Sequence, residues 1–204
     1  MAPPPLTGEG AARITMETNT TQPTLAVPSD EATEEQLQLA RDQGIALQKA
    51  VVHMMKHEAH GREVIAGDYL IGCAVEEAEG LYRPDDSGKL AWHEPERENA
   101  HIEISVRNAA DGRFLPGLSV RLTVLDADLR EIGTHEQPFL WHPWLYHYGR
   151  NWELPGDGDY TFRVHVDPPT WARHDRRNGR RFTAPVELEF RDVKIETGRK
   201  HSRP

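Results

Sequence analysis

From residue 62 onward, apolar residues recur at every second position, which is the repeat of a β-strand that buries one face. Turn signals such as Asp85-Asp86-Ser87-Gly88 and Asp167-Pro168-Pro169 separate the alternating blocks. The blocks cover residues 69–75, 102–106, 118–124, 160–166 and 186–190. Strands at this spacing, without helices between them, predict a mainly β fold, an antiparallel β-sandwich over residues 62–198 with a short tail at 199–204.

The segment 30–61 has the repeat of an amphipathic helix. Thr33-Glu34-Glu35-Gln36 has the form of a capping box, in which Thr33 caps the helix and Gln36 bonds back to the Thr33 amide. Apolar or small residues then follow at alternating spacings of three and four and form one narrow seam: Leu37, Ala40, Gly44, Leu47, Val51 and Met54. This seam must pack on the main domain or on a second copy of the helix, and its narrowness favours a partner helix.

Residues 1–29 are rich in Pro, Thr, Gly and Ala and predict a disordered N-terminal tail. They contain no apolar run of the kind that forms the core of a signal peptide. No segment approaches the roughly 18 apolar residues of a membrane span, which argues against direct membrane insertion. A net charge of −9 argues against a nucleic-acid partner, because phosphates would repel such a surface.

The single cysteine, Cys73, cannot form an internal disulfide. It alternates in phase with Ile71 and Val75, so the sequence predicts a buried thiol rather than a nucleophile. Five arginines lie between Arg173 and Arg181. A solvated loop whose charge is offset by nearby acids is favoured there over an anion site.

Histidine is concentrated in the second half of the chain, where six residues fall between His101 and His174. Neutral imidazole is the commonest protein ligand for transition metals. In the block around Ile102 and Ile104, the apolar residues occupy even positions, so His101 and Glu103 both project from the opposite face. Two such side chains can share one ion, although the same pattern also describes a polar outer face.

His142 and His147 lie in an unusually aromatic segment, 141–148, that is too irregular for a simple strand. Its rings either hold the imidazoles in place for a metal or form core or dimer contacts, and the local sequence does not separate these alternatives. His174 lies in a polar loop. His135 and His165 are not candidate ligands, because they read as turn and surface positions.

The order of several features resembles the periplasmic ferrous-iron transport protein family. These features are His101-Ile102-Glu103, His147-Tyr148-Gly149, Gly158-Asp159-Tyr160, Asp167-Pro168-Pro169 and His174, and the resemblance covers about residues 98–192. It implies an immunoglobulin-like β-sandwich, usually a homodimer, that binds copper beside a second iron or manganese ion. It also implies an iron permease in the inner membrane as a partner. By position, the metal ligands are His101, Glu103, His147 and His174.

The chain departs from this family at three points. The position of the family's methionine ligand holds Leu140, which cannot bind a metal, and His142 is the predicted replacement. As a harder ligand, His142 would weaken the preference for Cu⁺ relative to Cu²⁺ or Fe²⁺. The family is exported, whereas residues 1–29 show no signal, and the helix predicted at 33–60 has no counterpart, so a cytoplasmic location is the alternative.

Three functions follow as hypotheses. The first is a metal-binding accessory protein for iron and copper acquisition or handling, which uses His101, Glu103, His142, His147 and His174 to hold Cu²⁺ or Fe²⁺. Protons should then compete as the pH falls through about 6.5, the usual pKa of histidine. The second is a mononuclear copper or iron oxidase with the same ligands, which no nucleophile or separate acid–base pair supports. The third is an interaction module whose histidines are structural.

Overall fold

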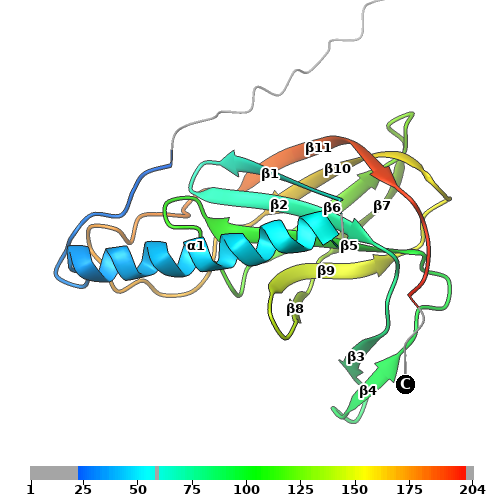
Figure 1. The fold of residues 1–204 in the computed structure, drawn as a ribbon, viewed down its shortest axis with the longest axis horizontal. Coiled ribbons are helices and arrows are strands. Elements are labelled where there is room, and N and C mark those ends of the chain that lie inside the picture. Colours follow the sequence, from blue (N-terminus) through cyan, green and yellow to red (C-terminus); the bar gives the residue numbers. More distant parts are fainter. Residues whose placement is uncertain (1–22, 58–59, 201–204) are drawn as a thin grey trace, which may run out of the picture.

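The computed structural model describes residues 23–57 and 60–200. It consists of antiparallel strands preceded by one helix, so the predicted mainly β fold is confirmed (Figure 1). The helix is α1 (Glu34–His57). The strands are β1 (His60–Ala66), β2 (Tyr69–Glu76), β3 (Leu81–Pro84), β4 (Leu90–His93), β5 (Ala100–Asn108), β6 (Val120–Leu125), β7 (Glu131–Glu136), β8 (Phe139–Trp141), β9 (Tyr146–Trp152), β10 (Gly158–Val166) and β11 (Val186–Ile195). The immunoglobulin-like subclass stays a prediction.

Two sheets enclose the main core. One sheet has the order β1-β2-β5-β9-β8 and the other β11-β10-β6-β7, while β3 and β4 form a separate hairpin. The alternating residues of the sequence fill the space between the sheets, as with Ile102, Ile104, Leu122 and Val164, which are fully buried. Cys73 belongs to this core, and burial raises the pKa of its thiol to about 12, so the predicted buried thiol is confirmed.

Helix α1 begins with the predicted capping box. The Thr33 amide donates to Gln36 Oε1 at 2.8 Å, and the Gln36 amide donates to Thr33 Oγ1 at 3.2 Å. The helix then runs across the outer face of the five-stranded sheet (Figure 1). Gly44 is required for this approach, because a Cβ at this position would lie 1.6 Å from the carbonyl oxygen of Asp111.

The seam of α1 packs on the protein's own sheet, so the preference for a partner helix was wrong. Near the end of the helix, Val51 and Met54 form a small apolar cluster with Ala74 of β2 and with Leu145. The seam is narrow because the covered sheet face is itself polar and offers few apolar contacts. Among the described residues, no helix is long and apolar enough to cross a membrane.

The face under α1 buries charge as well as apolar surface. Arg107 of β5 is fully buried, and its guanidinium donates to Glu63 of β1 and, at 2.5 Å, to Gln48 Oε1 of α1. These bonds connect the helix to two strands of the sheet. Since a buried charge without a partner is costly, the helix and the ion pair depend on each other.

The predicted tail lies partly within the described residues. Residues 1–22 and 201–204 lie outside them. Residues 24–29 are held by the loop that contains the basic cluster, where Arg177 Nη1 donates to the Pro28 carbonyl at 2.6 Å and Asn178 Nδ2 to the Val27 carbonyl at 2.9 Å. Of the loop arginines, Arg173, Arg177 and Arg181 donate to carbonyl groups of the chain itself.

Truncating Glu63 should leave the Arg107 guanidinium buried and unpaired. We expect Glu63→Ala to lower the free energy of unfolding by about 3–5 kcal/mol, measured by urea denaturation. The matched control is Glu153→Ala, which breaks the exposed Arg97–Glu153 pair and should cost less than about 1 kcal/mol. Equal losses in the two variants would contradict the structural role given to the buried pair.

Candidate metal site

His101 and Glu103 lie on the outer face of β5, as the alternation of the sequence predicts, but that face is not solvated. Their exposed fractions are 0% and 5%. Helix α1 covers one side of this region. On the other side, the C-terminal residues fold back on the sheet, where the Lys200 amide donates to the Ala78 carbonyl at 2.8 Å. Polar side chains buried at this depth must be paired or bind something.

His147 reaches the same place from β9, the neighbour of β5. The His147 imidazole faces the imidazole of His101 on β5. Gly149 lies opposite Glu103 in the strand register, and because glycine has no side chain it leaves the space between the two rings free. A Cβ at Gly149 would lie 3.0 Å from His147 Cδ2 and 3.2 Å from His101 Nε2. The segment predicted to be too irregular for a strand therefore holds its second histidine in one, whereas His142 lies in the turn between β8 and β9.

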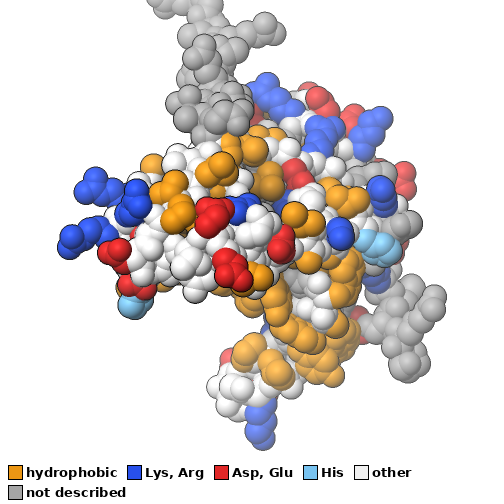
Figure 2. Space-filling view, turned by 60° about the vertical axis from the view of Figure 1, so that its left-hand side comes forward, with side chains coloured by type: hydrophobic (Ala, Val, Ile, Leu, Met, Phe, Trp, Pro, Cys, Tyr) orange, Lys and Arg blue, Asp and Glu red, His pale blue; other side chains and the backbone are white. Residues whose placement is uncertain are grey.

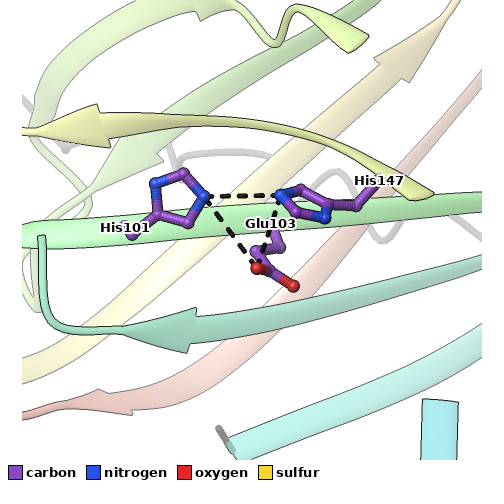
Figure 3. A group of neighbouring side chains, drawn as sticks. All are labelled: His101, Glu103 and His147. Carbon is purple, nitrogen blue, oxygen red and sulfur yellow. Dashed lines mark hydrogen bonds and ion pairs between the residues drawn. The ribbon is translucent and has the colours of Figure 1, made fainter. Parts of the chain in front are cut away.

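The three side chains converge on one point (Figure 3). His147 Nε2 lies 3.5 Å from His101 Nε2 and 3.4 Å from Glu103 Oε1, and His101 Nε2 lies 3.9 Å from Glu103 Oε1. A tetrahedral ion with bonds of about 2.1 Å separates its ligand atoms by roughly 3.4 Å. The spacing therefore fits one transition-metal ion without large movements.

The surrounding hydrogen bonds orient His101 for this role. Asn151 Nδ2 donates to the Glu79 carbonyl at 2.7 Å, so Asn151 Oδ1 is left as the acceptor that lies 2.9 Å from His101 Nδ1. His101 must then carry its proton on Nδ1, and the lone pair of Nε2 points at the cluster. Glu103 Oε2 and His147 Nδ1 are buried without a hydrogen-bond partner.

The imidazoles are neutral in the folded protein at ordinary pH. Burial, with smaller contributions from His101 and His142, lowers the pKa of His147 to about 3. Burial also lowers the pKa of His101, against the opposing charge of Glu79. For these imidazoles, competition between protons and metal is therefore expected at a lower pH than the predicted 6.5.

The pKa of Glu103 is shifted in the opposite direction from those of the two histidines. Burial and the neighbouring Glu76 carboxylate raise its pKa well above the usual range, so this carboxyl keeps its proton to a higher pH than an exposed glutamate does. Glu76 and Glu79 were not among the predicted site residues. Glu76 lies opposite His101 in the register of β2 and β5, and Glu79 Oε1 lies 4.0 Å from His101 Nε2. Lys200 Nζ pairs with both glutamates.

The signal for Glu76 was present in the sequence, although incomplete. Glu76 is one of the even-numbered residues of β2, which point away from the core. These residues share a sheet face with His101 once β2 and β5 pair. The pairing of β2 with β5 does not follow from the sequence of either strand alone. Asn151 was missed for the same reason, since it becomes a partner of His101 only through the register of β5 and β9.

His142 lies outside the group of three. It is half-buried, its ring centroid lies 5.6 Å from that of Trp144, and its Nδ1 has no partner. Leu140 is directly opposite His147 in the register of β8 and β9. His142 follows Leu140 by two residues and is thus a diagonal neighbour of His147, about 7–8 Å away between backbones.

His174 is not brought to the cluster within one chain. Its imidazole is 95% exposed and lies 3.6 Å from Glu31, just before α1. Val51 and Met54, near the other end of α1, line the same cavity as Glu103 and His147. At about 1.5 Å per residue, the helix separates the two places by about 30 Å.

The two histidines not taken as candidates have other contacts. His135 packs on Trp152, with 4.8 Å between ring centroids. His165 Nε2 lies 3.1 Å from Asp167 Oδ1, and His165 Nδ1 lies 3.6 Å from Glu187 Oε2, on the other sheet. Neither belongs to the metal-ligating group.

Comparison with known proteins places this geometry in context. The profile of the Fe²⁺ transport protein family matches residues 56–196. Among solved structures, FetP of uropathogenic E. coli strain F11 is 17% identical and covers 68% of this chain and 95% of its own, with a TM-score of 0.56. The copper-reconstituted P19 protein of Campylobacter jejuni is 16% identical and covers 70% of this chain and 98% of its own, with a TM-score of 0.57. No curated protein sequence matches the chain.

The proton on Glu103 gives metal binding a distinctive pH dependence. Metal must displace this proton, so the apparent association constant for Cu²⁺ should rise about tenfold per pH unit at pH values below the raised pKa of Glu103, and level off above it. Competition with a chelator of known affinity measures this. Glu103→Gln should bind more weakly and lose the slope, whereas Glu187→Gln, on the other sheet, should keep it. A slope that persists in Glu103→Gln would contradict this assignment.

Proposed function

Because this chain belongs to the Fe²⁺ transport protein family, we propose that it is a metal-binding accessory protein for iron and copper acquisition or handling. Its cargo would be a divalent transition metal held by His101, Glu103 and His147. One observation carries the proposal: the ligand atoms of these three buried side chains all lie within 4.8 Å of one another. Two neutral imidazoles and a carboxylate are a donor set that suits iron, copper and zinc.

The arrangement supports binding rather than catalysis. All three side chains come from adjacent strands, whose hydrogen-bonded register holds them in place. Glu103 is needed as a ligand, so it is not free to act as a general base for a bound substrate. By the Irving–Williams order, the site should take Cu²⁺ more tightly than Fe²⁺ in vitro, and metal supply would decide what it carries in the cell.

A homodimer and a membrane iron permease complete the proposal. Several aromatic side chains on the β8–β9 edge of the sheet are exposed: Phe139, Trp141, Trp144 and Tyr146. Hydrophobic side chains also gather on part of the surface in Figure 2. An edge of this kind suits a protein partner. His174, exposed in one chain, would contribute a ligand only to a second copy, and sedimentation velocity of the wild type and Trp141→Ser tests the dimer.

The ligand assignment is tested by removing one imidazole at a time. We expect His101→Ala and His147→Ala to lose most of their bound Cu²⁺ and Fe²⁺ after dialysis, measured by mass spectrometry of the metal, while the control His165→Ala keeps the wild-type content. Metal at about 100 times its dissociation constant should stabilise the wild type by roughly 2.7 kcal/mol, and this gain should vanish in the two site variants.

Two results would count against the function. Unchanged metal content in both site variants would remove the ligand assignment. A wild-type protein that shows no metal-dependent rise in melting temperature would instead favour an interaction module with structural histidines.

A further inference from the structure

We propose that Met54 of helix α1 supplies a thioether as the fourth ligand of the metal site, which gives the site affinity for Cu⁺. This inference rests on the proposed function and adds a ligand from outside the family match, which begins at residue 56. Three donors leave a four-coordinate ion one position short. The structure indicates where the fourth donor comes from.

A cavity of about 20 Å³ adjoins Glu103 and His147, between the end of α1 and the sheet. This is enough space for about one water molecule or one ion. Its other walls include the last turns of α1, with Val51, Met54 and Met55. The helix therefore closes the side of the site that the strands leave open.

The register of the sheet brings Met54 next to two of the ligands. Met54 is 6% exposed and belongs to the apolar cluster that includes Ala74 and Leu145. Ala74 is the direct cross-strand partner of Glu103, and Leu145 precedes His147 by two residues. Residues in these relations lie about 4.5–7 Å apart on one sheet face, within reach of a methionine side chain that packs over both.

The other sulfur atoms around the cavity are occupied elsewhere. The Met55 thioether lies against Gly61, where a Cβ would come within 2.5 Å of its Sδ. The Cys73 thiol belongs to the core between the sheets, and burial raises its pKa to about 12, so it does not offer a thiolate.

The oxygen donors are weaker alternatives. The Glu63 carboxylate lines the cavity but pairs with Arg107. Ser105 and Tyr146 also line it, but neutral hydroxyls are not among the usual ligands of copper, and the Tyr146 ring packs against Phe114 and Phe139. Thioether sulfur is a soft donor that prefers Cu⁺ over harder divalent ions. Met54 would thus allow the same site to hold copper in its reduced state.

The test compares Cu⁺ binding by the wild type, Met54→Leu and the matched control Met55→Leu, by competition with a Cu⁺ chelator under reducing conditions. Leucine keeps an apolar side chain of similar volume, so the helix should stay docked, which circular dichroism and the melting temperature check. We expect Met54→Leu to bind Cu⁺ at least about tenfold more weakly, with a smaller change for Cu²⁺, and Met55→Leu to match the wild type.

Copper K-edge absorption of the full-length wild type gives a readout that needs no variant. We expect one sulfur neighbour beside nitrogen and oxygen, and its loss in Met54→Leu. A copper-loaded wild type with nitrogen and oxygen neighbours alone would overturn the role of Met54 and leave the proposed function standing. Loss of the sulfur neighbour in Met55→Leu instead, or a weakening of Cu⁺ binding confined to His142→Gln, would also overturn it. A wild type that binds no copper would refute both proposals.

Discussion

The structure depends on burying a polar sheet face under a helix. Helix α1 covers the part of the β5 face that carries Glu103 and Arg107, and the C-terminal residues fold back on the sheet near His101, so water cannot satisfy these buried groups. Each buried polar group left without a partner costs about 1–3 kcal/mol, and a buried charge costs more. The helix is stable on this face only because internal partners replace water, which explains why its apolar seam is narrow and why the covering residues include Gln48.

The two ends of the covered face meet this requirement differently. At one end, the two terminal nitrogens of the Arg107 guanidinium donate to Gln48 and Glu63, although its Nε has no partner, and the result is a structural connection. At the other end, Glu103 Oε2 and His147 Nδ1 stay without partners. The other polar atoms of these side chains, Glu103 Oε1 and His147 Nε2, converge with His101 Nε2, and a bound ion would join all three. Burial therefore makes the Arg107 end of the face a rigid connection and leaves the end with His101, Glu103 and His147 able to bind an ion.

Electrostatics add to this difference. Glu76, Glu79 and Glu103 lie around His101, and among their neighbours Lys200 offsets part of their charge. Crowded carboxylates in a place of low dielectric hold protons or attract cations. The raised pKa of Glu103 shows the first response, and metal binding would be the second. Burial keeps the imidazoles neutral, so they are ready to act as ligands over a pH range much wider than that of an exposed histidine.

The sequence by itself determined the helix and the strands β2, β5, β6, β10 and β11, with the direction of their side chains, because these depend on local periodicity. The period of two placed His101 and Glu103 on one strand face, and Thr33 with Gln36 marked the start of the helix. Pairing between strands was decided only by the tertiary structure, since register depends on contacts far apart in the chain. That pairing brought His147 next to β5 and left His142 beside the group of three ligands. His174 lies about 30 Å from this group along α1. The packing of α1 on its own sheet, rather than on a partner helix, was also decided only by the tertiary structure. Burial, which lowers the pKa of the two imidazoles and raises that of Glu103, is likewise a property of the assembled layers and not of any segment.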